Sequence, residues 1–277
     1  MSLNKADYTM LDDWFRTLRL KISFDEFKRL PRTLGYKHEY FDGTCVLTPR
    51  PRNCYAVLRL DRFAAPPACT DDEVAIRPLQ DADWDSLGQR CGFAFHRIPP
   101  FDTLTDDEKK QAGRQCMEHT RGGGDGPLIA EASHVAVDDQ GSPLGVLLIV
   151  LKPAGYCQDP WRNDHWRLPP AADAVAARAG QAHVNWLFVS PWHVGHGVAS
   201  AMLAASVAAL REMEYESLSS CFMLGNGESM AWHWRNGFEL LPNPASMRYF
   251  LRRMKQVQDK PASGPAPPAQ DDSHEQR

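Results

Sequence analysis

The sequence lacks the features that carry a protein into or across a membrane. A helix that spans the bilayer needs about 20 mainly apolar residues, and the 277-residue chain has no such run. The first residues, Met1 to Asp7, contain no hydrophobic core of a secretory signal. We therefore expect a soluble protein of the cytoplasm that has no membrane partner.

Closely spaced cysteine pairs are also absent. The seven cysteines are scattered along the chain, and no two of them form the Cys-x-x-Cys pattern of zinc sites and redox motifs. An odd number of scattered thiols fits a reducing compartment better than a disulfide framework. The sequence thus predicts neither a metal site nor disulfide bonds.

A strong net charge is missing as well. The formal net charge is -4, so the chain as a whole does not attract nucleic acid or an anionic membrane. Its 43% hydrophobic and 24% charged residues are ordinary for a globular protein. The length allows one large domain, or one medium domain with an appendage. Small molecules and other proteins are the expected partners, and a homodimer is left open.

What the sequence does contain is a strand, a glycine turn and a helix in direct succession. Residues 183–189 (HVNWLFV) are apolar and β-prone, and Pro191 ends the strand. Gly195 and Gly197 follow, and small and apolar residues recur at helical spacing from Val198 onwards. Glycines let the backbone approach a ligand, and the free N–H groups at the start of a helix attract anions. This arrangement is typical of a phosphate-binding turn.

A second segment, residues 226–238 (NGESMAWHWRNGF), begins with an asparagine and ends with Gly-Phe after a short helix. Together the two segments resemble the GCN5-related N-acetyltransferase (GNAT) superfamily, whose first signature is Arg/Gln-x-x-Gly-x-Gly/Ala. That signature falls on residues 194–199, with Val194 where Arg or Gln is usual. The resemblance covers roughly residues 74–256. It implies a mixed α/β fold, with a mostly antiparallel, twisted sheet of six to seven strands flanked by about four helices.

The resemblance also implies a binding site for acetyl-CoA. In the family the acyl-pantetheine arm lies along the signature strand, and main-chain N–H groups of the turn hold the pyrophosphate. Because any residue supplies a main-chain N–H group, the departure at Val194 leaves the second role intact. The asparagine of the second signature contacts the cofactor arm. The implied cofactor-binding residues are Leu187, Phe188, Val189, Val194, Gly195, His196, Gly197, Val198, Ala199 and Asn226.

Two histidines occupy positions at which the family carries catalytic groups. The usual proton donor to the thiolate is a tyrosine four residues before the glycine of Gly-Phe, and here that position is His233. Several members carry a base six residues before the valine of Val-x-Pro, and here that position is His183. Asn185 shares the strand face of His183 because side chains alternate. Imidazole can do either task near neutral pH. A structural role for either histidine, or an enzyme without a dedicated acid, is left open.

Residues 1–63 are expected to form a separate N-terminal helix-plus-hairpin region. Apolar patterns predict helices near residues 10–18 and 24–30, the second of which begins at Ser23. Asp42-Gly43 predicts a hairpin, and a third strand is expected at 54–60. This hairpin faintly resembles the start of Uma2-type nuclease-like domains, but we assign it no activity. Turn geometry explains Asp-Gly fully, so we expect a hairpin that extends the neighbouring sheet.

The other domain boundaries are predicted from changes in amino-acid composition along the chain. Residues 64–73 lack periodicity and indicate a linker, residues 74–256 hold the acetyltransferase-like domain, and residues 257–277 have the composition of a disordered end. The glycine loop 122–126 is expected to be mobile rather than a second phosphate site. The insertion 152–181, rich in Pro, Trp and Ala, is either a lid over the substrate or plain surface.

The sequence therefore predicts an acyl-CoA-dependent N-acyltransferase, which passes acetyl from acetyl-CoA to a primary amine of a small molecule or a protein. Two alternatives stay open. Because Val194 and His233 depart from the family pattern, the chain could be a catalytically weak or inactive acetyl-CoA-binding regulatory module. It could also be an interaction protein that acts through its N-terminal region.

Overall fold

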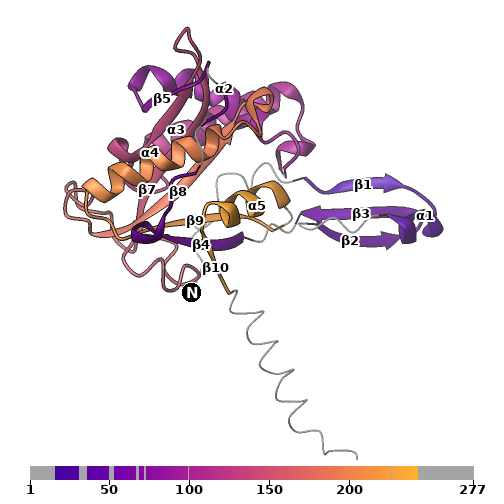
Figure 1. The fold of residues 1–277 in the computed structure, drawn as a ribbon. Coiled ribbons are helices and arrows are strands. Elements are labelled where there is room, and N and C mark those ends of the chain that lie inside the picture. Colours follow the sequence, from indigo (N-terminus) through magenta and orange to yellow (C-terminus); the bar gives the residue numbers. More distant parts are fainter. Residues whose placement is uncertain are drawn as a thin grey trace, which may run out of the picture. The chain divides into compact units, whose positions relative to one another are not determined.

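The computed structural model describes residues 16–30, 36–49, 53–66, 69–71, 73–98, 100–224 and 226–242 (Figure 1). Most of its secondary structure belongs to a seven-stranded sheet, in the order β10-β4-β9-β8-β7-β6-β5. These strands are β4 (Asn53–Arg59), β5 (Ala75–Pro78), β6 (His134–Val137), β7 (Pro143–Pro153), β8 (Gly180–Val189), β9 (Ser217–Met223) and β10 (Glu239–Leu241). Neighbouring strands are antiparallel except β8 and β9, which are parallel.

Four helices accompany this sheet in the described part of the chain. They are α2 (Trp84–Ala94), α3 (Asp106–Arg121), α4 (Val198–Glu212) and α5 (Gly227–Arg235). The mixed α/β class, the seven strands and the four helices confirm the fold expected from the sequence. Within the described residues, no helix is both long enough and apolar enough to cross a membrane.

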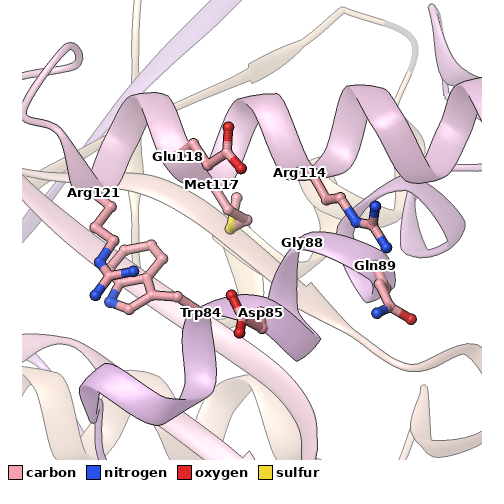
Figure 2. Close-up of a pocket in the computed structure, with 8 residues that line it drawn as sticks. All are labelled: Trp84, Asp85, Gly88, Gln89, Arg114, Met117, Glu118 and Arg121. Carbon is pink, nitrogen blue, oxygen red and sulfur yellow. The ribbon is translucent and has the colours of Figure 1, made fainter.

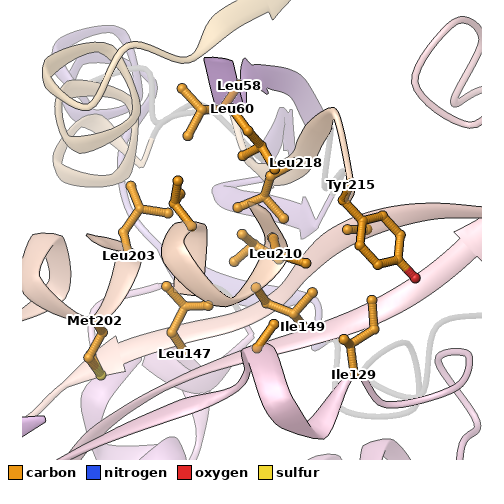
Figure 3. Close-up of a cluster of buried hydrophobic side chains, with 14 of the residues drawn as sticks. Leu58, Leu60, Ile129, Leu147, Ile149, Met202, Leu203, Leu210, Tyr215 and Leu218 are labelled. Carbon is orange, nitrogen blue, oxygen red and sulfur yellow. The ribbon is translucent and has the colours of Figure 1, made fainter. Parts of the chain in front are cut away.

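The side chains of β7 divide the core into two parts, one on each face of the sheet. Leu147 and Ile149 pack with α4 residues such as Leu203 and Leu210 in one cluster (Figure 3). Val146 and Leu148 belong to the other cluster, which contains residues of α2 and α3. This split follows from the two-residue period of a strand. A strand that is buried on both faces reads as one continuous apolar run, as residues 144–151 do.

The N-terminal region contains a smaller sheet of three strands, in the order β1-β3-β2. Its strands are β1 (Leu18–Lys21), β2 (Tyr36–Phe41) and β3 (Thr44–Pro49), and α1 (Phe24–Arg29) follows β1. The predicted hairpin is confirmed, with Asp42 and Gly43 at φ angles of 44° and 72°. The capping box of α1 between Ser23 and Glu26 is confirmed too. The helix expected at 10–18 is not seen at its C-terminal end, because Leu18 pairs with β3 instead; residues 10–15 lie outside the described residues.

Strand β4 does not join this small sheet. It lies between β9 and β10 in the main sheet, where Tyr55 is the pairing partner of both Cys221 and Leu241. A chain cut at residue 63 would therefore lose an inner strand of the main sheet. From the sequence we also expect a last strand at residues 246–252, which lie outside the described residues.

The insertion between β7 and β8 contains no helix or strand in residues 154–179. It is nevertheless attached to the main sheet at several points. Ala174 is buried in the core, and the Nε1–H of Trp166 donates to the carbonyl of Leu151. Tyr156 is also buried, and its ring lies 5.0 Å from that of His183. The insertion thus covers part of the face of β8 that carries His183.

Candidate active site

The central feature of the site is a gap that opens between the parallel strands β8 and β9. Strand β8 pairs with β7 along its whole length, as far as Val189 with Gly145. Its pairing with β9 is much shorter, from Ala182 with Leu218 to Val184 with Ser220. Beyond Val184 the edge of β8 that faces β9 has no ladder partner among the described residues. Backbone groups of residues 185–189 on this edge are therefore available to a ligand.

A β-bulge marks the point where the gap begins. Leu148 of β7 pairs with Trp186 and Ile149 pairs with Val184, so Asn185 is an extra residue in β8. As a result Asn185 and Trp186 both reach α3, where each donates a hydrogen bond to Thr120 Oγ1, at 3.1 and 3.0 Å. The sequence predicted the face of Asn185 but not the bulge.

Asp125 completes this polar group. One of its carboxylate oxygens, Oδ2, accepts from Thr120 Oγ1 at 2.6 Å and from Asn185 Nδ2 at 2.8 Å. The other, Oδ1, lies 3.6 Å from His119 Nε2, and a quarter of the Asp125 side chain is exposed. Asp125 belongs to the glycine loop 122–126, which the sequence analysis expects to be mobile. A role for Asp125 in the site was therefore not predicted. The signal that could have found it is the only carboxylate in that loop.

The glycine loop itself is closely packed. A Cβ atom on Gly126 would lie 2.3 Å from the carbonyl oxygen of Leu151, and one on Gly124 would meet the ring of His119. Lys152 Nζ donates to the carbonyl of Asp125 at 3.0 Å. The glycines here are needed for close approach of the backbone to its neighbours, which differs from the free loop expected from the sequence.

At its far end β8 leads into the glycine turn and α4. Gly195 and Gly197 have φ angles of 93° and 85°, and a Cβ on Gly195 would meet nothing within 4 Å. Gly197 is the N-cap of α4, and no side chain caps this helix. The first intrahelical bond comes from the N–H of Ala201. The N–H groups of residues 198–200 therefore have no partner within the helix, which leaves them open to an anion.

The other predicted residues of the turn divide by exposure. Val194 and His196 are exposed, Val198 is buried, and Ala199 is intermediate. The structure brings the strand residues 187–189 and the turn residues 194–199 into one continuous path from the gap to the start of α4. Asn226 stands apart in its role, because its Oδ1 accepts from the N–H of Ser229 at 3.0 Å and so caps α5.

A segment that the sequence described as linker lies against this turn. Thr70 N–H donates to the carbonyl of His196 at 3.0 Å, and Cys69 Sγ lies 3.3 Å from the same oxygen. Asp71 Oδ2 lies 2.9 Å from Nδ1 of His193. This hydrogen bond is the main cause that lowers the pKa of Asp71. Residues 69–71 therefore help to hold the turn in place.

His183 is buried, but one of its ring nitrogens keeps a free lone pair. Its Nδ1 lies 2.9 Å from Ser219 Oγ, and that hydroxyl donates to the carbonyl of Ala182 at 3.0 Å. Because the hydroxyl has a single hydrogen, Nδ1 must be the donor, so Nε2 carries the lone pair. Nε2 has no hydrogen-bond partner among the described residues. Burial, aided by the charge of Lys152, lowers the pKa of His183 well below its usual value, so the ring is neutral at pH 7.

His233 differs, because both of its nitrogens are engaged. Its Nδ1 lies 2.7 Å from the carbonyl oxygen of Ser229 and must donate, so Nε2 accepts from Ser220 Oγ at 2.7 Å. Burial lowers the pKa of His233 to about 4. The ring also packs on Phe222 and Phe238. At neutral pH, His233 therefore has no proton that it could give to a group in the gap.

Two hollows lie elsewhere on the molecule. One, of about 420 Å³, lies between α2 and α3, where Arg114 reaches toward Gln89, and Trp84 and Arg121 lie at the other end (Figure 2). The other, of about 520 Å³, lies within the insertion and is lined by residues such as Arg162 and Trp166. Neither is lined by the site residues predicted from the sequence. In the described part of the chain, no group of His, Cys, Asp and Glu side chains could hold a metal ion.

A comparison with models of protein families shows which family this chain matches. The model of the acetyltransferase (GNAT) family matches residues 99–238, which is half of the chain and includes the gap, the turn and α5. The chain belongs to the GNAT family of acetyltransferases. No curated protein is similar enough in sequence to count as a match.

Solved structures of GNAT proteins are similar to this chain at low identity. A GNAT acetyltransferase from Brucella melitensis in complex with acetyl-CoA is 18% identical, with 62% of this chain and 88% of that chain covered and a TM-score of 0.40. A GCN5-related N-acetyltransferase from Sphaerobacter thermophilus is 14% identical. The match covers 81% of this chain and 56% of that chain, with a TM-score of 0.43. A GCN5-related N-acetyltransferase from Ralstonia eutropha JMP134 is 16% identical. The match covers 62% of this chain and 94% of that chain, with a TM-score of 0.40.

Proposed function

We propose that this GNAT protein transfers the acetyl group of acetyl-CoA to a primary amine, by direct attack of the amine on the thioester. The observation that supports the proposal is the continuous path from the gap at Asn185 to the start of α4. The backbone edge of residues 187–189 can pair with the amides of the pantetheine arm, and the free N–H groups of residues 198–200 can donate hydrogen bonds to the pyrophosphate. Gly195, where a Cβ would meet nothing within 4 Å, leaves room for that approach, and Gly197 turns the chain with a φ of 85°.

Residues Val194 and His196 are proposed to bind through their main chain only. Both side chains are exposed, and neither is needed if N–H groups hold the pyrophosphate. Asn226 is proposed to border the cofactor arm while its Oδ1 caps α5.

His183 is the proposed base on the amine side. Its Nε2 lone pair, left free because Nδ1 donates to Ser219, is the group that can accept a proton from an ammonium group. The amine then attacks the carbonyl carbon and a C–N bond forms. The nitrogen releases its second proton to solvent as the C–S bond breaks. CoA leaves as a thiolate, which is a fair leaving group and takes a proton from solvent. His183 returns its own proton to solvent.

We propose a structural role for His233 in place of the acid role that the family position implies. The imidazole joins α5 to β9 through Ser229 and Ser220, and its low pKa leaves it uncharged. The thiolate needs no dedicated donor in this scheme.

The test is the release of free CoA thiol in steady state with a panel of primary amines, beside calorimetry of acetyl-CoA binding. We expect binding, and release that depends on the amine. Binding without amine-dependent release would contradict the transferase and favour the regulatory module. Absence of binding would contradict both.

A further inference from the structure

The polar group at the bulge contains one carboxylate oxygen, Asp125 Oδ1, that accepts no hydrogen bond from the described residues. Asp125 Oδ2 is fixed by two short hydrogen bonds from Thr120 and Asn185. Among the described residues, the one interaction of Oδ1 is with His119 Nε2 at 3.6 Å, an ion-pair distance that is longer than a hydrogen bond. A carboxylate that is held rigidly by one oxygen while the other stays open can receive a cation.

The position of this oxygen matters because Asn185 is the residue at which the gap opens. Val184, just before it, is the last β8 residue paired with β9, and its partner is Ser220. Cys221 comes next on β9. Burial raises the pKa of the Cys221 thiol, and the charge of Asp125 adds to that rise although Lys152 opposes it. Through Asn185, Asp125 is attached to β8 at the point where the two strands separate.

The same face of β8 carries His183. Asn185 and Trp186 reach α3 on this face, and the ring of His183 contacts Tyr156 and Ser219 there. The face that carries His233 is the opposite one, because His233 bonds the next serine along β9. An amine that is to lose its proton to His183 must therefore approach on the side of Asp125.

We propose that Asp125 recognises the acceptor: its Oδ1 binds the ammonium form of the amine beside the gap and selects cationic acceptors over neutral ones. This inference rests on the proposed function. Two other titratable side chains contact Asp125 in the described part of the chain. They are His119, beside Oδ1, and Lys152, whose Nζ donates to the main-chain oxygen of Asp125. The binding step makes and breaks no covalent bond, and the proton is passed on to His183 as described above.

The experiment compares two nucleophiles in wild type and in Asp125→Asn. n-Butylamine and lysine amide are cationic at neutral pH, whereas hydroxylamine is uncharged and needs no ammonium site. Asparagine keeps the shape of the side chain and an oxygen for Thr120 and Asn185. We expect kcat/KM for the two amines to fall roughly tenfold to hundredfold, mainly through KM, because a charged hydrogen bond is lost. Transfer to hydroxylamine should stay close to wild type.

Thr120→Val is the matched control. It removes a hydroxyl from the same network but leaves the negative charge of Asp125. We expect it to affect the amines and hydroxylamine equally, and acetyl-CoA binding by calorimetry reports whether each variant is folded.

Two outcomes overturn the inference while the proposed function stands. The first is an equal loss for the amines and hydroxylamine in Asp125→Asn, which would make the carboxylate structural. The second is no loss for either nucleophile. If wild type binds acetyl-CoA but transfers to none of these nucleophiles, the proposed function fails and the inference fails with it.

Discussion

Ser219 and Ser220 are adjacent on β9, yet their hydroxyl groups serve two histidines on opposite faces of the sheet. Ser219 accepts from His183 Nδ1, whereas Ser220 donates to His233 Nε2. The two serines thus fix opposite roles for Nε2, free in one ring and occupied in the other. The hydrogen bonds therefore distinguish His183 from His233, although both occupy positions at which the family carries catalytic groups.

The first prediction concerns His183. His183→Ala should lower kcat/KM by about 10² to 10⁴ at neutral pH, and the loss should shrink as pH rises and solvent deprotonates the amine. Ser219→Ala keeps the imidazole but removes the partner that fixes its tautomer, so a smaller loss is expected. Rates with the best amine of the panel between pH 6 and 9 test this. A pH-independent loss in His183→Ala would argue against the base.

His233 is predicted to affect stability rather than rate. Its pKa is about 4 in the folded protein and 6.5 when unfolded. Between these values the unfolded chain binds a proton that the folded one does not. The free energy of unfolding therefore falls as pH drops from 6.5 to about 4, by about 3 kcal/mol from this residue, and is unaffected above 6.5.

His233→Phe removes that dependence. The variant should be less stable than wild type at pH 7, since Ser220 and the Ser229 carbonyl lose a partner, and this deficit should narrow by pH 4.5. Urea unfolding at both pH values measures it, and kcat/KM should change by less than about tenfold. A deficit that is the same at both pH values would show that His233 is not buried in its neutral form.

The third prediction concerns the turn before α4. Gly195→Ala should weaken acetyl-CoA binding, measured by calorimetry, because the new methyl group enters space left for the ligand. Gly141→Ala is a matched control, since Gly141 also has a positive φ and nothing within 4 Å of a Cβ. Both should lose about 1–2 kcal/mol of stability to the strained backbone. Equal affinity in the two variants would count against the site, as would a large loss in His196→Ala.

The fourth prediction concerns β4. A chain that begins at residue 51 keeps β4 and should still fold and bind acetyl-CoA, whereas one that begins at residue 74 loses it and should not. The reason is that β9 and β10 both pair with β4. Circular dichroism and calorimetry compare the two. Cooperative unfolding of the shorter chain would show that the domain from residue 74 is complete without β4.

Local pattern was enough to place the elements on either side of the glycine turn. The apolar, β-prone run that ends at Pro191 indicated β8, and helical spacing after Gly197 indicated α4. The capping box at Ser23 was visible in the same way. These features depend on residues that are close together in the chain.

Features that depend on distant partners could not be read in this way. Cys54 to Leu60 reads as a strand, but nothing in those residues says that it pairs with β9 rather than β3. The bulge at Asn185 is set by the register with β7, and the contact of Thr70 with His196 joins segments more than a hundred residues apart. Leu18 has a helical pattern around it, but pairing with β3 overrides that preference.

The place of β4 also bears on how the chain folds as it is synthesised. Its residues leave the ribosome early, but its neighbours β9 and β10 are among the last parts of the described chain to be made. Until then Ala56 and Leu58, which are fully buried in the finished sheet, have nothing to pair with. Contacts this far apart in sequence slow folding, and an unpaired apolar strand invites aggregation. Nascent chains stalled before residue 217 should therefore depend on chaperones more than the completed protein does.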